Sequence, residues 1–229
     1  VIGFAKLEVG VDTDDSGSDT FDSRLAYVGL SANSIGDISV GRQSHPFTDN
    51  VATTASIFEV YGGSSSFSYG TRSSNSIAYS KSLGQVSINA LGVVDGASGK
   101  DGVDSYEWSA SVDVVDGVSI SGGLASDEAN DTFYYGVGMT TEISDDLSIA
   151  SSYTMKDAAT DLTAWEVAGS FKMLSVGYGD KEGTGAFTTV GVSHDLSADL
   201  KLYAETEMVD NEGSATDTQS WSIGTKFSF

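Results

Sequence analysis

The stretch Trp221-Ser222-Ile223-Gly224-Thr225-Lys226-Phe227-Ser228-Phe229 decides how the rest of the sequence is interpreted. Every second residue, beginning with Trp221, is apolar or borderline, whereas the alternate residues are small or polar. Successive side chains of a β-strand point to opposite faces, so this pattern is typical of a strand with one apolar face and one polar face. If the whole chain follows the same pattern, we expect a sheet whose two faces meet different environments.

The composition limits the classes of protein that the chain can represent. It has 229 residues, one Pro, no Cys and a formal net charge of −22. No run approaches the ~20 apolar residues that a transmembrane helix needs. A barrel wall, in contrast, needs apolar residues only at alternate positions, so low hydrophobic content does not exclude a membrane protein. The strong negative charge argues against a nucleic-acid partner and favours the attraction of cations.

Segments with period-two alternation recur along the whole chain, and helical periodicity is almost absent. Their lengths are near the ~9–11 residues that a tilted membrane strand requires. We count fourteen such segments, at residues 2–12, 21–32, 37–43, 72–82, 85–94, 104–115, 117–126, 132–143, 147–156, 162–173, 174–181, 185–196, 199–209 and 217–229.

The connections between these segments alternate strictly between short and long. Tight turns occur at 33–36, 83–84, 116–117, 144–146, 173–174 and 197–199, and longer acidic links at 13–20, 44–71, 95–103, 127–131, 157–161, 182–184 and 210–216. Short turns on one side and long loops on the other are typical of transmembrane β-barrels. We therefore predict an all-β, antiparallel barrel that occupies residues 1–229 as one domain, with periplasmic turns and extracellular loops.

A sheet in hydrocarbon must leave no edge, because each unpaired backbone group there costs several kcal/mol. We therefore expect the first and last strands to pair and close the wall. A barrel of fourteen or more strands is too wide for side chains to fill, so the lumen should be a water-filled pore.

Alternation assigns charged side chains to the lumen face of the wall. Acidic residues outnumber basic ones on that face, which predicts a preference for cations. The lumen acids are Glu107, Asp113, Glu166, Glu205 and Glu207, and the lumen lysines are Lys156, Lys172, Lys201 and Lys226.

Aromatic residues are expected in two belts at the membrane interfaces, where amphipathic rings prefer to lie. Trp108, Trp165 and Trp221 fall toward the loop ends of their strands, and Phe171, Phe227 and Phe229 toward the turn ends.

Two sets of residues carry a resemblance to a known family. Residues 21–30 and 36–43 read Phe-Asp-Ser-Arg-Leu-Ala-Tyr-Val-Gly-Leu and Gly-Asp-Ile-Ser-Val-Gly-Arg-Gln, and residues 72–79 read Arg-Ser-Ser-Asn-Ser-Ile-Ala-Tyr. Together with the final strand they resemble the trimeric general diffusion porins of Gram-negative bacteria. That family usually has sixteen strands, and by register the first hairpin is missing here. Either the barrel is a shorter one, or the sequence covers only part of it. The resemblance implies a homotrimer in the outer membrane, with lipid and lipopolysaccharide as neighbours and Phe229 read by the barrel assembly machinery.

The resemblance also implies a pore that is narrowed by an inward-folded third loop, for which 44–71 is the candidate. In the family, acidic residues on this loop face arginines on the wall. The acidic candidates are Asp49 and Glu59, and the basic candidates are Arg24, Arg42 and Arg72. For Arg42 two placements are open: a bulge at Gly41 turns it inward, or it caps its strand above the lipid.

The function that these features favour is passive diffusion of small hydrophilic solutes and ions. An oligosaccharide-specific channel is the alternative, although an aromatic path along the lumen is not evident. A non-channel surface protein or adhesin and a calcium-binding solenoid are weaker alternatives, since no fixed repeat is present. No cofactor is expected. Acidic loops such as Asp127-Glu128-Asp131 could hold Ca²⁺ or Mg²⁺, although solvated loop charge is the simpler interpretation. His45 and His194 are far apart and suggest neither an enzyme nor a metal site.

Overall fold

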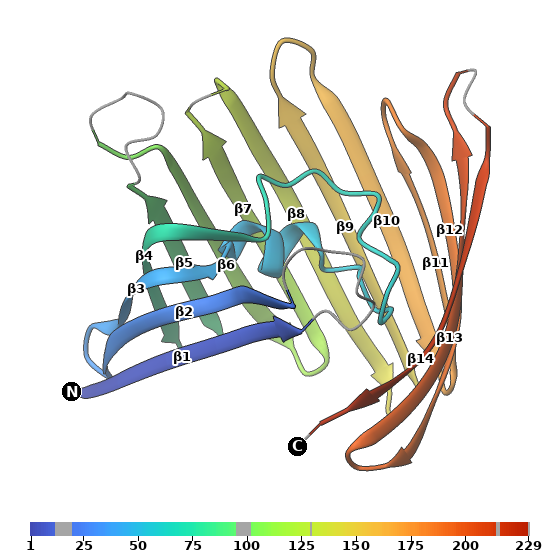
Figure 1. Ribbon diagram of the computed structural model, residues 1–229, viewed down its shortest axis with the longest axis horizontal. Coiled ribbons are helices and arrows are strands. Elements are labelled where there is room, and N and C mark those ends of the chain that lie inside the picture. The colour runs from blue at the N-terminus through green and yellow to red at the C-terminus, as the bar shows by residue number, and fades with distance from the viewer. Residues whose placement is uncertain (12–19, 95–101, 129, 214–215, 229) are drawn as a thin grey trace.

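The structure is a computed structural model that describes residues 1–11, 20–94, 102–128, 130–213 and 216–228. It contains a single fourteen-stranded antiparallel sheet in which every strand pairs with its neighbour in sequence. Figure 1 shows the sheet curving around an interior space. The strands are β1 Ile2–Val11, β2 Phe21–Ala32, β3 Gly36–Ser44, β4 Arg72–Leu83, β5 Val86–Val93, β6 Ser105–Val115, β7 Val118–Asp127, β8 Thr132–Ser144, β9 Leu147–Asp157, β10 Leu162–Phe171, β11 Leu174–Lys181, β12 Gly185–Ser197, β13 Leu200–Asn211 and β14 Thr218–Phe227.

The two faces of the sheet differ as the alternation predicts. In β10, Trp165 and Val167 are exposed on the outer face, whereas Ala164, Glu166 and Ala168 are buried on the inner face. The large apolar residues exposed on the other strands include Val, Ile, Leu, Tyr and Trp. A wall that is apolar outside and polar inside suits a protein surrounded by lipid. Within the described residues, no helix is long and apolar enough to cross a membrane.

Short turns and long links alternate along the chain, as predicted. One predicted turn is displaced: Phe171 pairs with Leu174, so the turn between β10 and β11 is Lys172–Met173 and not Met173–Leu174. Lys172 has φ of 55°, a left-handed conformation that such a tight reversal requires. The link 13–20 lies almost entirely outside the described residues, as does most of 95–103.

The expected closure of the wall is not present in the described residues. β1 and β14 are the two ends of the strand order and share no pairing with each other. Figure 1 shows them at opposite edges of the curved sheet. Each strand is rotated relative to the next by the sheet's twist, and fourteen strands at this curvature do not bring the two edges within hydrogen-bonding distance.

The link between β3 and β4 covers residues 45–71, one residue shorter than predicted because Ser44 is the last residue of β3. It contains η1, a single π-helical turn at Thr48–Ala52. Figure 1 shows this segment inside the curve of the sheet, in front of β6–β10. η1 contacts β6, β7, β8 and β9. We refer to residues 45–71 as the inner loop.

Candidate pore constriction

An apolar cluster fixes the first part of the inner loop. Phe47, Val51 and Ala52 are fully buried and pack with Ala125 of β7. Tyr69 and Tyr134 pack against this cluster at its margin. Removing these side chains from water favours a loop that lies against the wall rather than across the open mouth.

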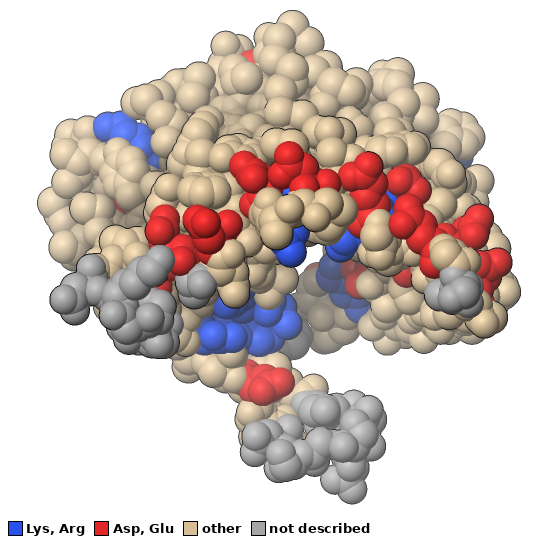
Figure 2. All heavy atoms as spheres, turned by 90° about the horizontal axis from the view of Figure 1, so that it is seen from above, with Lys and Arg blue, Asp and Glu red and all other residues tan. Residues whose placement is uncertain are grey.

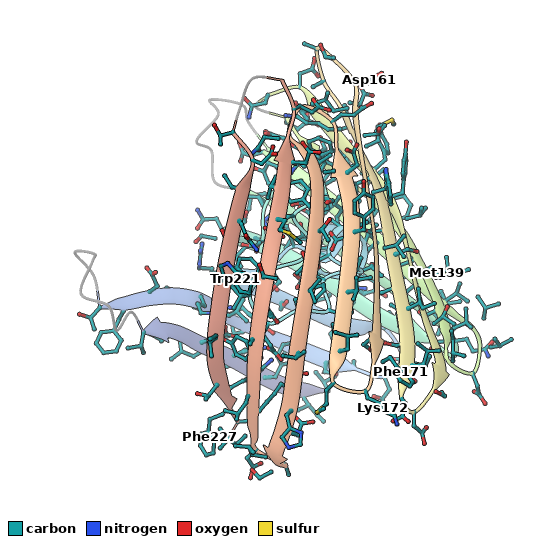
Figure 3. All side chains as sticks on the ribbon, turned by 90° about the vertical axis from the view of Figure 1, so that its right-hand side faces the viewer. Met139, Asp161, Phe171, Lys172, Trp221 and Phe227 are labelled. Carbon is teal, nitrogen blue, oxygen red and sulfur yellow. The ribbon has the colours of Figure 1, made fainter. Side chains whose placement is uncertain are left out.

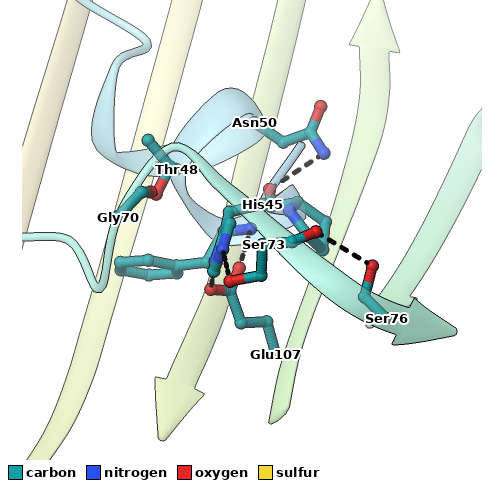
Figure 4. A network of polar contacts seen from close by, with 9 residues as sticks. His45, Thr48, Asn50, Gly70, Ser73, Ser76 and Glu107 are labelled. Carbon is teal, nitrogen blue, oxygen red and sulfur yellow. Dashed lines mark hydrogen bonds and ion pairs between the residues drawn. The ribbon is translucent and has the colours of Figure 1, made fainter. Parts of the chain in front are cut away.

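A buried polar contact joins the same part of the loop to β6 (Figure 4). His45 Nδ1 and Glu107 Oε1 are hydrogen-bonded, and the other ring nitrogen of His45 lies 2.7 Å from Ser73 Oγ of β4. The backbone N–H of Phe47 donates to Glu107 Oε2 at 3.0 Å. Glu107 is only 2% exposed. Glu107 was predicted to be a charge of the lumen. Its carboxylate is instead covered by the loop and anchors it.

Three further glutamates of the wall bind the distal part of the loop. Glu205 of β13 accepts the backbone N–H groups of Glu59, Val60 and Tyr61, at 2.7, 2.9 and 3.3 Å. Glu166 Oε1 of β10 accepts the N–H of Gly63 at 3.2 Å, and Ser64 Oγ donates to Glu207 Oε2 at 3.1 Å.

Charged acceptors form stronger hydrogen bonds than neutral ones. Glu205 and Glu166 are 6% and 4% exposed, so the loop covers two more residues that were predicted to face the pore. We call Glu107, Glu166, Glu205 and Glu207 the wall glutamates.

Inward-facing glycines leave room for the loop. A Cβ atom at Gly138 of β8 would lie 2.2 Å from Thr54 Oγ1, and one at Gly179 of β11 would lie 2.5 Å from Ser65 Oγ. At Gly177 the corresponding atom would meet the Phe58 ring at 2.9 Å. These glycines belong to two Gly-x-Gly pairs, at 136–138 and 177–179, which no predicted site included. They were a usable signal, because alternate glycines on the polar face of a strand indicate a close approach by another segment.

Glu59, near the tip of the loop, accepts hydrogen bonds from two lysines. Its carboxylate lies 3.0 Å from Lys201 Nζ of β13 and 2.8 Å from Lys226 Nζ of β14. The resemblance had suggested arginines as the partners of the loop acids. The tip instead reaches the opposite end of the sheet, where the inward basic residues are lysines. The hydrogen bonds from these two lysines hold the pKa of Glu59 below its ordinary value.

The predicted arginines lie near the base of the loop. Arg24 is an extra residue in a bulge, since Glu8 pairs with Leu25 and Val9 with Ser23. The bulge places its guanidinium against Glu8 of β1, with which it forms an ion pair.

Arg42 lies in a second bulge, between Gly41 and Gln43, which the sequence had left as one of two alternatives. It donates to the Ser23 carbonyl at 2.9 Å and to Ser74 Oγ at 3.2 Å, so it joins β2, β3 and β4 rather than contacting a loop acid.

Asp49 and Arg72 are the predicted pair that the structure brings within electrostatic range. Burial raises the pKa of Asp49, while the hydroxyl of Ser44 and the positive charge of Arg72 act in the opposite direction. The constriction assigned to Arg24, Arg42, Arg72, Asp49 and Glu59 thus divides into two separate groups, one at the loop base and one at its tip.

Two other predicted lumen charges lie at the turn ends. Lys172, which alternation assigned to the lumen, occupies the β10–β11 turn, where its side chain is 60% exposed and lies near Asp146 and the Phe171 ring. Strict alternation fails there because the strand has already ended. Asp113 is exposed beside the bulge that ends the β6–β7 pairing, near Gln85 and Asp116.

Predicted belt aromatics are exposed on the outer face. Trp108, Trp165, Phe171 and Phe227 all have more than a third of their surface accessible, and Trp165 packs edge to face on Tyr178. Figure 3 places Phe171 and Phe227 toward the turn end of the wall, as predicted, and Trp221 near its middle height. Phe229 lies outside the described residues. In the acidic loop after β7, Asn130 Nδ2 donates a hydrogen bond to Asp127 Oδ2 at 2.6 Å. Metal binding by this loop stays a prediction.

Charge is distributed unevenly around the opening. Figure 2 shows the molecule from above. Acidic side chains form a band across this view, and basic side chains lie below the band and beside the hollow. Acids and bases on different sides of an aqueous passage create a transverse field that acts on ions and dipolar solutes.

Comparison with known proteins identifies this architecture. The family model described as Gram-negative porin matches residues 2–229. The chain belongs to the Gram-negative porin family. Comparison with curated proteins finds no match. As a porin of this family, the protein is an outer-membrane channel, and the resemblance seen in residues 21–43 and 72–79 is confirmed.

Solved porin structures share the fold at low sequence identity. The chain is similar to Salmonella typhi OmpF in complex with daunomycin, with a TM-score of 0.80 and 12% identity over 98% of this chain and 84% of that chain. It is also similar to a triple mutant of Rhodopseudomonas blastica porin, with a TM-score of 0.74 and 19% identity over 98% of this chain and 83% of that chain. For in-vitro folded Vibrio cholerae OmpT in its trimer form, the TM-score is 0.70 and the identity is 18%, over 97% of this chain and 85% of that chain.

Proposed function

We propose that this porin is a general diffusion channel for small hydrophilic solutes and ions, narrowed by the inner loop. The observation that carries the proposal is the path of the loop. It crosses the inner face of the sheet from β3 to β13 and β14 and is bound there by the wall glutamates, Lys201 and Lys226. A segment bound along one side of a wide lumen reduces its cross-section without filling it.

We also propose a preference for cations and assembly as a homotrimer. The formal charge of −22 and the acidic upper surface in Figure 2 support the first, since negative potential at a pore mouth raises the local cation concentration. The lysines and arginines at the two loop groups offset part of that potential, so the preference should be modest. The trimer form of Vibrio cholerae OmpT supports the second. Lipopolysaccharide and the assembly machinery are the proposed partners of the outer surface and of Phe229.

Single-channel recording of the folded protein in planar bilayers tests the diffusion channel. We expect large conductance steps in groups of three and a cation-selective reversal potential in a KCl gradient. The selectivity should weaken as salt rises, since charges are screened over ~10 Å at 0.1 M. An anion-selective reversal potential would contradict the cation preference, and independent single steps would contradict the trimer.

Cysteine labelling tests the narrowing separately, because the chain has no Cys of its own. Val60 at the loop tip is exposed, and Val167 is exposed on the outer face of β10. A bulky thiol reagent should reduce the conductance of Val60→Cys and leave that of Val167→Cys unchanged. Equal conductance for labelled and unlabelled Val60→Cys would show that the inner loop does not limit the pore.

A further inference from the structure

A row of polar side chains crosses the inner face of five strands, on the turn side of the inner loop. The strands are β2 to β6, which are adjacent in the sheet (Figure 1). Each member of the row is the direct cross-strand partner of the next, so neighbouring Cβ atoms lie about 4.5 to 5.5 Å apart. We call this set the polar row. It consists of Ser31, Asp37, Ser80, Asn89 and Ser109.

The middle of the polar row offers free hydrogen-bonding groups. Asp37, Ser80 and Asn89 are half-buried, and in the described part of the chain their side chains form no hydrogen bond or ion pair. The amide of Asn89 and the hydroxyl of Ser80 can each donate and accept, whereas the carboxylate of Asp37 only accepts. At the end of the row, Asn50 Nδ2 of η1 donates to Ser109 Oγ at 3.0 Å. The inner loop therefore borders the row, and the row can bind a ligand that carries several hydroxyl groups.

The free groups of the polar row line two adjoining cavities. The volumes of these cavities are about 380 and 560 Å³, and the residues common to both linings are Asp37, Asn50, Ser80 and Asn89. Sites for small molecules usually have volumes of about 300 to 1,000 Å³. Because four residues line both cavities, the free groups of the row face the same space, and that space is large enough for a small solute.

Two aromatic side chains border the smaller cavity. Phe4 of β1 and Tyr27 of β2 both line it, and their ring centroids lie 6.3 Å apart at an interplanar angle of 85°. The Phe4 ring lies over Gly29 of β2, where a Cβ atom would collide with it. An aromatic face beside hydrogen-bonding groups suits a sugar ring, because C–H groups pack against the negative face of the aromatic ring while the hydroxyls bind polar side chains.

The formal charges that line the two cavities cancel. Lys6 and Lys81 are balanced by Asp37 and Asp49. Lys81 Nζ is held by a hydrogen bond of 2.6 Å to the carbonyl of Ser34. The chain as a whole, in contrast, has a formal charge of −22. A recess without net charge gives neither cations nor anions a Coulombic advantage, so it favours neutral solutes.

We propose that the polar row and Phe4 form a binding subsite for neutral sugars inside the pore. The inference rests on the proposed diffusion channel, which is the route by which a sugar reaches the subsite. Each hydrogen bond to the sugar replaces one to water, so its net contribution is small and binding is weak. Weak binding suits a channel, because a solute that binds must also leave.

Saturation-transfer NMR on the folded protein in detergent tests the subsite without requiring conduction. The probes are raffinose, a neutral trisaccharide, and a polyethylene glycol of similar mass, which has ether oxygens in place of hydroxyls. The wild-type protein should transfer magnetisation to the ring protons of raffinose and not to the glycol. Asn89→Ala and Phe4→Leu should each raise the dissociation constant for raffinose about fivefold. Ser175→Ala, at an inward position of β11 outside the row, should bind as the wild type does.

Equal transfer to raffinose and to the glycol would overturn the subsite, as would unchanged binding in both Asn89→Ala and Phe4→Leu. Planar-bilayer recording separates the subsite from the channel. In a conducting wild-type channel, raffinose should reduce the KCl current in a saturable way, and Asn89→Ala should need more raffinose for the same reduction. A protein that binds raffinose without conducting would contradict the proposed function alone. A protein that conducts without binding raffinose would contradict the subsite alone.

Discussion

The carboxylate of Glu205 accepts the backbone N–H of Glu59 at 2.7 Å, across 146 positions of sequence. The same carboxylate receives the next two backbone amides of the loop. Because backbone groups make these contacts, they do not depend on which side chains the loop tip carries. The side chains of the tip remain free for other contacts, such as those of Glu59 with the lysines of β13 and β14.

Replacing Glu205 should loosen the loop tip. Glu205→Ala removes the acceptor of three N–H groups, each worth about 1.5 to 3 kcal/mol when the partner is charged. We expect more frequent brief closures in single-channel records and faster thiol labelling of Val60→Cys in this background. Glu142→Gln, near the turn end of β8, is the matched control. If brief closures are no more frequent in Glu205→Ala than in the control, this carboxylate does not hold the loop.

The contact between His45 and Glu107 should matter for stability, whereas the second histidine should not. His45→Ala leaves Glu107 buried with fewer donors, at a cost of about 1 to 3 kcal/mol. His194 lies beside Val192 and Leu202 in a depression on the outer face, away from the loop. The urea midpoint of His45→Ala should fall below the wild-type value, and that of His194→Ala should not. Equal midpoints for the two variants would argue against the anchor.

Adding a methyl group at an inward glycine should displace the loop. At Gly138 the new Cβ would lie 2.2 Å from Thr54 Oγ1, so Gly138→Ala should cost about 1 to 3 kcal/mol through overpacking. At the neighbouring Gly122 of β7 the nearest atom is 3.6 Å away, and Gly122→Ala should be tolerated. We expect altered conductance and lowered stability only for Gly138→Ala. The same measurements on Gly122→Ala report any general effect of losing a glycine from the sheet.

The loop tip should detach at low pH. The pKa of Glu59 is lowered by the hydrogen bonds from Lys226 and Lys201, so the folded state favours its ionised form. That stability is present above the ordinary pKa of 4.5 and is lost as pH falls through the depressed folded value. Labelling of Val60→Cys, after correction for thiol reactivity, should accelerate as pH falls below 4.5.

Glu59→Gln should remove this pH dependence and label quickly at every pH. If Glu59→Gln shows the same acid response as the wild type, protonation of Glu59 is not the cause of the faster labelling. Asp49 would not account for such a response. Its pKa is raised by burial, so protonation favours its folded environment and acid should strengthen rather than weaken the loop base.

Alternation in single strands was enough to predict fourteen antiparallel strands, their turns and the apolar outer face. In β10, for example, Trp165 and Val167 had to share one face and Glu166 the other, because backbone geometry alone sends neighbouring side chains to opposite sides. The chain departs from strict alternation at two of the charged residues assigned to the pore. Arg24 lies in a bulge, and Lys172 lies beyond its strand in a turn of positive φ.

The sequence predicted the inner loop and its charged contacts only in part. A long link after residue 44 indicated an inward loop by resemblance, and Asp49 does lie near Arg72. The pairing of Glu59 with Lys201 and Lys226 joins residues more than 140 positions apart, and no local pattern specifies it.

The sequence by itself determined which residues face lipid and which face the interior, because that choice is local and repeats every two residues. Only the tertiary structure decided which interior charges meet water. Glu107, Glu166 and Glu205 are on the polar face by sequence, yet the inner loop covers all three and uses them as acceptors. The loop can do so because the curved sheet brings β6, β10 and β13 around one space, and backbone amides that leave water must find partners there.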